Sequence, residues 1–327
     1  MFSASAPEFA RAIALSLVLS CNGIDPVQAQ LPSTQPVVIE AGRLPNIETS
    51  APLDVYTIDR EDLDRAPELR LDDILRAEVP GFSLFRRNSS RTANPTTQGV
   101  TLRNFGPNGA GRTLVLWDGV PLNDPFAGYV LWNQVPPDAL DSIVVVSGGG
   151  AGLFGNEALA GTIFLISAPV TRNGAQIGVA GGSYDTYEAS VEATMTQSSM
   201  SAVVFAERFS TSGYAVVRAD QRGPVDNTAS DDSAVFSVRT QWQLGSETTV
   251  RLSLREFYDD RGNGTILTRN SSLGEDAAVV LTNKFPAESA ELQLAVYGQY
   301  RRFSSTFSSI NGQRTSETPA LDQSRNI

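Results

Sequence analysis

The chain has 327 residues, a formal net charge of −11 and 41% hydrophobic residues. It is long enough for two domains, and its acidic balance argues against nucleic acid as the partner. It contains no histidine, and its one cysteine, Cys21, lies close to the N-terminus. Once a leader containing Cys21 is removed, a histidine-based triad, a cysteine nucleophile and a Cys/His zinc site are all excluded.

Residues 1–29 are predicted to be a signal peptide. Arg11 precedes an apolar run from Ala12 to Leu19, and Val27-Gln28-Ala29 has the small residues of a cleavage site. The apolar run is far shorter than the ~20 residues that span a bilayer as a helix. A lipoprotein signal with an acylated Cys21 is the alternative, and both interpretations predict export.

Residues 30–49 contain a short β-prone run flanked by proline and glycine, which cannot bury itself. It is either the first strand of the next domain or an exposed strand that pairs with the sheet edge of a partner protein. The run consists of Gln35, Pro36, Val37, Val38, Ile39, Glu40 and Ala41.

Residues 50–168 have the pattern of a small α/β domain. A helix is predicted over 68–78, because Leu69, Leu71, Ile74, Leu75 and Val79 fall near one face and Pro80-Gly81 ends it. Short β-branched runs bounded by turn residues predict strands. These strands are expected at 51–58, 82–85, 113–117, 142–146 and 162–166, with a tight turn at Asp118-Gly119 and a short helix starting at Pro136-Pro137.

The sequence Gly150-Ala151-Gly152-Leu153-Phe154-Gly155 imitates a dinucleotide-binding motif. Such a site needs a crossover helix and an acidic residue about twenty positions later. The next strand opens at Gly161, which leaves no room for that helix, and 175–180 contains no acidic residue. We therefore expect these glycines to serve tight turns.

Two loops of the α/β domain hold candidate binding residues. The loop around 86–95 carries Arg86, Arg87, Asn88 and Arg91, which either meet an anionic ligand, pair with carboxylates of a surrounding wall or face solvent. The loop 123–134 carries Asn123, Phe126, Tyr129 and Trp132. Aromatic side chains in such a loop usually pack on something, either a wall or a ligand.

Residues 169–327 alternate between apolar and polar positions, as β-strands with one apolar face do. Seven strands are expected near 175–182, 186–196, 201–212, 233–244, 248–258, 277–285 and 290–304. Short connections alternate with long polar ones, expected at 213–231, 259–276 and after 305, as in a transmembrane β-barrel. The strands of a soluble β-sandwich also alternate between apolar and polar positions. A sandwich would bury one face away from water, however, so arginines within the strands fit the water-filled lumen of a barrel better.

The polar tail 313–327 is not counted among these strands and lacks the aromatic-terminated strand with which such barrels end. Because a barrel must close to avoid unpaired edges in lipid, these strands predict only the first part of a barrel. The chain would then be a fragment, a truncated reading frame or a decayed gene.

From about Pro36 to Ala168 the sequence resembles the plug domain of TonB-dependent outer-membrane receptors. The resemblance rests on the order and spacing of five motifs: Leu71-Asp72-Asp73-Ile74-Leu75 with Val79-Pro80-Gly81, Val100-Thr101-Leu102-Arg103, Leu116-Trp117-Asp118-Gly119-Val120-Pro121, Phe154-Gly155 and Gly161. It implies an α/β plug followed by antiparallel transmembrane barrel strands, incomplete in this chain.

The resemblance also implies a function. A receptor of this family, located in the cell outer membrane, binds a scarce ligand such as an iron–siderophore or a corrinoid and imports it with energy from a TonB-type periplasmic protein. Residues 35–41 would be the TonB box, and the loops near 86–97 and 123–134 would form the plug apex that senses ligand. No cofactor, metal or catalytic residue is expected, and arginines in the loops favour an anionic chelate.

Some residues depart from the family pattern. Asn104 stands where a glycine is usual, Val144 and Ser147 replace a glutamate and an arginine, and Phe164 replaces an asparagine, so the sequence leaves open how the plug is locked. A plug-like binding module without transport is the second hypothesis. A secreted carbohydrate-active enzyme is the third, but Asp259-Asp260 has no evident catalytic partner in the sequence, and Asp72-Asp73 is better explained as a helix start.

Overall fold

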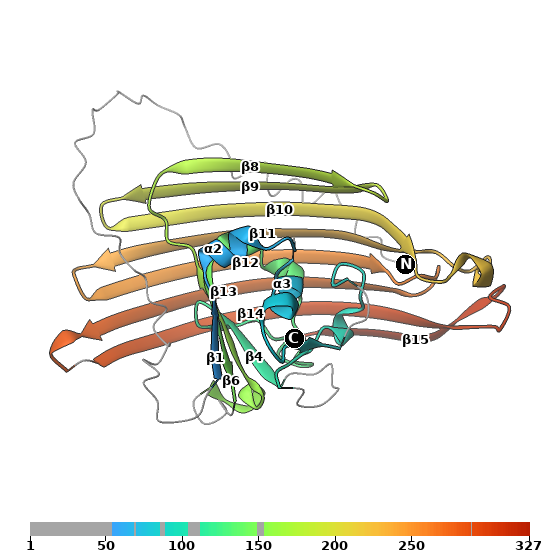
Figure 1. Ribbon diagram of the computed structural model, residues 1–327, viewed down its shortest axis with the longest axis horizontal. Helices are drawn as coiled ribbons and strands as arrows, with labels where there is room; N and C mark the ends of the chain where they lie inside the picture. The colour runs from blue at the N-terminus through green and yellow to red at the C-terminus, as the bar shows by residue number, and fades with distance from the viewer. Residues whose placement is uncertain (1–53, 69, 86–88, 104–111, 149–153, 289) are drawn as a thin grey trace. The chain divides into compact units, whose positions relative to one another are not determined.

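The computed structural model describes residues 54–327, apart from 69, 86–88, 104–111, 149–153 and 289 (Figure 1). None of the helices in these ranges is both long and apolar enough to cross a membrane. The described chain contains a small α/β domain, the plug, followed by a long-stranded antiparallel sheet, the wall.

The plug is built on a five-stranded sheet with the order β1-β6-β7-β4-β5, in which β4 and β7 run parallel. A separate pair, β2–β3, is antiparallel. The elements are β1 (Asp54–Ile58), α2 (Arg60–Arg65), α3 (Leu71–Glu78), β2 (Ser83–Leu84), η1 (Pro95–Thr97), β3 (Val100–Thr101), β4 (Thr113–Trp117), β5 (Val120–Pro121), η2 (Trp132–Gln134), η3 (Pro137–Ala139), β6 (Leu140–Ser147), η4 (Asn156–Ala158) and β7 (Gly161–Ser167).

Apolar residues cover both faces of the central plug strands. Ile143 and Val145 of β6 pack in the main core with α3 and Trp132, while Val144 and Val146 belong to a second apolar cluster on the opposite face. A strand buried on both faces needs a continuous apolar run, which is why the plug strands do not alternate. The predicted strands at 113–117, 142–146 and 162–166 are confirmed.

The helical part of the plug differs from the prediction in two places. The predicted helix begins at Leu71 rather than residue 68 and buries Leu71, Ile74 and Leu75. The short helix α2 was not expected. It begins with a capping box, in which Asp59 accepts from the Asp62 backbone and Asp62 accepts from the Asp59 backbone.

The wall contains eight antiparallel strands in chain order, which Figure 1 shows side by side from β8 to β15. They are β8 (Gly174–Gly182), β9 (Thr186–Gln197), β10 (Met200–Ala215), β11 (Thr228–Leu244), β12 (Thr248–Gly262), β13 (Arg269–Phe285), β14 (Ala290–Ile310) and β15 (Glu317–Asn326). The sheet is not closed, so the barrel is incomplete in this chain, as expected.

The predicted strand ends were wrong on the side of the long loops. β10 to β14 extend well into the segments expected as loops, and the polar tail forms β15, the eighth strand. Alternation failed there because polar residues occupy both faces of these extensions, as Thr228–Asp232 shows. Their inward face is buried but mostly polar, as at Asp231 and Ser233, so burial leaves no apolar pattern in the sequence. The longer connections are 216–227, 263–268 and 311–316, opposite the short turns 198–199, 245–247 and 286–289.

Candidate functional site

The inner face of the wall is rich in charged groups that meet the plug. Arg239 of β11 donates to the Ala168 carbonyl at 2.7 Å, and Arg261 of β12 donates to the Ser90 carbonyl at 2.6 Å. Both arginines occupy inward positions of strands whose outward positions are mainly apolar. The plug is thus fastened by polar contacts, of which four groups are described below.

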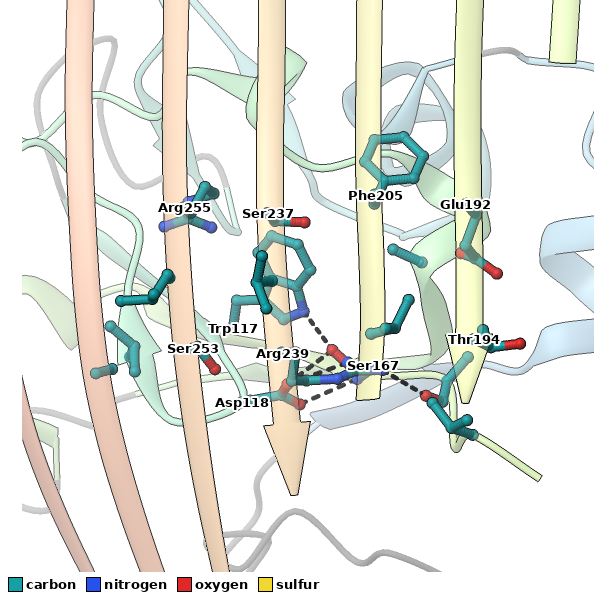
Figure 2. Close-up of a pocket in the computed structure, with 18 of the residues that line it drawn as sticks. Trp117, Asp118, Ser167, Glu192, Thr194, Phe205, Ser237, Arg239, Ser253 and Arg255 are labelled. Atoms are coloured by element: carbon teal, nitrogen blue, oxygen red, sulfur yellow. Dashed lines mark hydrogen bonds and ion pairs between the residues drawn. The ribbon is translucent and has the colours of Figure 1, made fainter. Parts of the chain in front are cut away.

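The first group, the Asp118 cluster, consists of Asp118, Ser167, Arg239 and Arg251, of which Figure 2 shows the first three. Asp118 accepts hydrogen bonds from the Ser167 amide at 3.0 Å and from its hydroxyl at 2.7 Å. The guanidinium groups of Arg239 and Arg251 each lie 3.6 Å from the carboxylate. A carboxylate on the plug is therefore held by two cations on the wall.

Local geometry places Asp118 at the tip of the β4–β5 hairpin. Asp118 and Gly119 both have positive φ angles, 49° and 88°, as a type I′ turn requires. Burial tends to raise the pKa of the Asp118 carboxyl. The charges of Arg251 and Arg239 and the Ser167 hydrogen bonds outweigh it, so that the pKa lies below its usual value.

Trp117, next to Asp118, links the same cluster to a second set of charges. Its indole N–H donates to the Ser167 hydroxyl at 2.8 Å, and the Arg255 guanidinium lies 5.0 Å from its ring centroid. Arg255 and Arg301 both pair with Asp276 of β13. The indole ring therefore rests on a charged layer of the wall.

The second group surrounds Arg91 of the plug. Its guanidinium lies 3.2 Å from Glu188 and 3.3 Å from Glu207, and donates to the Ser233 hydroxyl at 3.3 Å. It also stacks 3.7 Å above the ring centroid of Phe209. One plug arginine thereby contacts β9, β10 and β11.

The third group contains a fully buried ion pair. Arg261 forms an ion pair with Asp259 and donates to the carbonyls of Ser90 and Ala93. Asn133 of the plug donates to the same Asp259 carboxylate. Two plug segments are therefore tied to one strand, β12.

The fourth group joins the loop after β5 to β15. Arg325 lies 2.6 Å from Asp124 and donates to the Tyr129 hydroxyl at 2.9 Å. Its guanidinium also lies 4.9 Å from the ring centroid of Phe126. Burial and the nearby Asp124 charge raise the pKa of Tyr129, which keeps the phenol protonated.

The structure gives the candidate apex residues different environments. Asn123 holds its own loop, accepting from the Val115 amide at 2.8 Å and donating to the carbonyls of Thr113 and Gly128. Trp132 lies in the plug core and is 1% exposed. Asn123 and Trp132 therefore present no free surface in this state.

The other apex candidates contact the wall or face outward. Arg91 and Tyr129 are engaged as described above, whereas Phe126 is 76% exposed. Arg86, Arg87 and Asn88, and the predicted TonB box Gln35–Ala41, lie outside the described residues. Ligand binding by any of these residues stays a prediction.

Of the four positions that depart from the family pattern, Val144 and Phe164 are apolar packing positions, Ser147 is a buried polar residue, and Asn104 lies outside the described residues. Val144 and Phe164 lie in the cluster with Leu114, Leu116 and Ile166. The fastening of the plug uses other residues, above all Asp118. Sequence reasoning recognised Asp118 only as a turn residue and Arg239 only as a lumen residue, because their pairing depends on the register of distant strands.

A cavity of about 120 Å³ lies between the plug and the inner face of β9–β13 (Figure 2). Its walls combine apolar side chains such as Phe205 with Glu192, Thr194, Ser237 and Ser253. Among the described residues, no group of three or more Asp, Glu, His or Cys side chains is arranged to hold a metal ion. The cavity can accommodate a small polar molecule or a few waters.

Comparison with known proteins agrees with this architecture. Residues 47–162 match the family model for the TonB-dependent Receptor Plug Domain. The vitamin B12 transporter BtuB of Vibrio cholerae is 30% identical over 185 residues, which is 56% of this chain and 28% of the relative. The probable TonB-dependent siderophore receptor PirA of Acinetobacter baumannii is 30% identical over 131 residues, 37% of this chain and 17% of the relative.

Solved structures show the same fold. The ferric enterobactin receptor PfeA of Pseudomonas aeruginosa superposes with a TM-score of 0.62 at 18% identity, covering 85% of this chain and 46% of that receptor. The crystal structure of PirA gives a TM-score of 0.59 at 18% identity, covering 83% and 43%. This chain spans less than a third of the length of the two curated relatives, BtuB and PirA. The chain is thus similar to the TonB-dependent receptors in its plug-domain match and in its fold, a plug domain followed by an antiparallel sheet that forms part of a barrel.

Proposed function

We propose that this chain provides the plug and the first part of the barrel of a TonB-dependent receptor in the outer membrane. The receptor binds and imports a scarce ligand, such as an iron–siderophore or a corrinoid, with energy from a TonB-type periplasmic protein. The observation that carries the proposal is the plug-domain match over residues 47–162. The names of the relatives, a vitamin B12 transporter and siderophore receptors, supply the ligand classes.

The domain organisation belongs to the same proposal. Residues 1–29 are the signal peptide, 30–49 hold the TonB box and a linker, 50–168 form the plug, and 169–327 form the barrel strands. The partner pulls on the box at residues 35–41 by strand pairing, in which backbone hydrogen bonds supply the affinity.

The contacts between plug and wall suit a plug that must move. They include many ion pairs and hydrogen bonds, as in the Asp118 cluster and around Arg91, beside two small apolar clusters that join plug and wall. Such contacts have a small net stability because water compensates both partners when they separate. The main apolar core of the plug, including Trp132, lies within the plug itself. Displacing the plug therefore does not require that core to open.

The partner interaction is tested with the purified periplasmic domain of a TonB-type protein. Val38→Pro removes a backbone N–H from the box and should abolish binding to that domain. The matched variant Val38→Thr keeps the N–H, so its Kd should stay within about twofold of the value for the unmodified chain, a change in binding free energy well under 1.4 kcal/mol. Equal binding by both variants would contradict strand pairing at residues 35–41.

The open sheet, with β8 and β15 at its edges, supports a second candidate function: a plug-like binding module without transport. The two functions differ in the size and location of the native product. A heat-modifiable band well above the 35.0 kDa of this chain, found in the outer-membrane fraction, supports the receptor. A product absent from that fraction supports the module.

A further inference from the structure

Three hollows follow one another along the inner face of β9–β12. The first, about 260 Å³, lies between the plug helices and β9–β10 and reaches Glu188, Ser190 and Glu207. The second is the 120 Å³ cavity in Figure 2, and the third holds only about 10 Å³. The third is no larger than the space of a single water.

The hollows share lining residues, so they form one interrupted track. The first and second share Asp138 and Phe205. The second and third share Ala168, Val170 and Arg239.

The strands give the track a direction. On β9 the successive inward residues Glu188 and Ser190 line the first hollow, and Glu192 and Thr194 line the second. The third ends at Ser201, Gln241 and Arg251, beside the short turns 198–199 and 245–247. The track therefore descends toward the side of the short turns, which in outer-membrane barrels is the periplasmic side.

The narrow end of the track coincides with the Asp118 cluster. Arg239 and Arg251 line the third hollow and both lie 3.6 Å from Asp118. Arg239 also donates to the Ala168 carbonyl on the plug at 2.7 Å. Losing the Asp118 charge would free both guanidinium groups to move away from the plug, which would widen the track where it is narrowest.

The charge along the track is negative. The first hollow is lined by five carboxylates and three arginines, and of these arginines Arg91 pairs with both Glu188 and Glu207. In the described part of the chain, Glu192 has no cation within ion-pair distance, although it lines the middle hollow. Arg60, Arg70, Arg91 and Arg255 also line the first two hollows, but each is paired with a carboxylate. The carboxylate of Glu192 and the hydroxyls of Thr194, Ser237 and Ser253 therefore remain to meet a solute in the middle hollow.

From these observations we infer that the passage between plug and wall follows β9–β12, that the Asp118 cluster closes its periplasmic end, and that it favours neutral or cationic polar solutes over anions. The inference rests on the proposed transport function and adds the route, the gate and the charge preference. It departs from the anionic chelate suggested by the loop arginines, because every described arginine along the track is engaged by a carboxylate or a carbonyl.

The experiment measures how fast a thiol inside the track reacts. Cys21→Ser removes the only native cysteine, and Ser237→Cys then places a thiol in the middle hollow of the complete chain in detergent. Two methanethiosulfonate reagents of similar size, one with a trimethylammonium group and one with a sulfonate, modify it, and mass spectrometry follows the rates. A thiol at the exposed position Gln313 is the matched control.

Asp118→Asn tests the gate, because asparagine followed by glycine keeps the type I′ turn while the charge is lost. Modification at position 237 should become about tenfold faster, equivalent to about 1.4 kcal/mol in the opening equilibrium, with no change at position 313. Arg251→Gln should have the same effect from the wall side. Unchanged rates at position 237 in both variants would overturn the gate.

The charge preference is tested with the same thiol. The ammonium reagent should react several-fold faster than the sulfonate, and Glu192→Gln should reduce that ratio at least twofold, since one nearby charge is removed. Faster reaction of the sulfonate would overturn the preference. Since neither measurement needs a ligand or a TonB-type partner, a failure of transport would leave these results interpretable.

Discussion

Replacing Arg91 should loosen the plug from the wall, and the size of the effect follows from its contacts. Arg91→Gln leaves Glu207, whose side chain is 12% exposed, without its ion partner, which costs about 1.5–3 kcal/mol for a hydrogen bond to a charged group. Glu188 is 37% exposed, so its pair adds only about 0.5 kcal/mol. Loss of the stacking on Phe209 adds about 1 kcal/mol. Because such terms are not additive, we expect a total near 3 kcal/mol.

The assay is a urea titration followed by tryptophan fluorescence in detergent. The chain has three tryptophans, and Trp242→Phe leaves Trp117 and Trp132, both in the plug. With a slope of about 2 kcal/mol per molar urea for a domain of this size, the plug transition should move down by about 1.5 M. Arg76→Gln is the matched control, because Arg76 is 57% exposed and pairs with Asp73 within α3. A shift for Arg91→Gln no larger than the control shift would refute the reasoning.

Three further predictions concern the plug. Gly161→Ala should destabilise it by more than about 2 kcal/mol in the same titration, because the added methyl group would overlap the Val146 carbonyl at a φ angle of +151°. The contribution of Asp118 to stability should be complete above pH ~4, its unfolded pKa, and lost as the pH falls through its lower folded pKa. Asp118→Asn should flatten that acid limb in a pH titration of plug fluorescence. Phe126→Ala should lower the free energy of unfolding from the urea titration by less than about 0.5 kcal/mol, since the ring is 76% exposed. Leu75 is fully buried, so Leu75→Ala should lower that free energy by about 2–5 kcal/mol.

Most of the plug could be predicted from local patterns. The strands β4, β6 and β7 are apolar runs between turn residues, and α3 has a clear apolar face that ends at Pro80-Gly81. Helix α2 escaped prediction because its six residues are too few for helical periodicity. Its signal was the pair Asp59 and Asp62, which form the capping box.

The wall was predictable where one strand face is apolar and one polar. Alternation fails in the outer extensions such as Thr228–Asp232, where both faces are mostly polar although the inward face is buried. The same limit explains β15, whose sequence has almost no apolar alternation but pairs with β14 from Arg302 to Ile310.

The sequence by itself determined most of the plug's elements and the alternating barrel strands, because hydrophobic periodicity and turn chemistry act over a few neighbouring residues. Only the tertiary structure decided how the plug is fastened. Asp118 meets Arg239 and Arg251 more than a hundred residues away, and such pairing depends on strand register and on where the plug rests. The same applies to Arg91, a candidate ligand contact in the sequence that the structure surrounds with wall carboxylates. The residues next to a charged side chain in the sequence do not indicate which distant residue will pair with it.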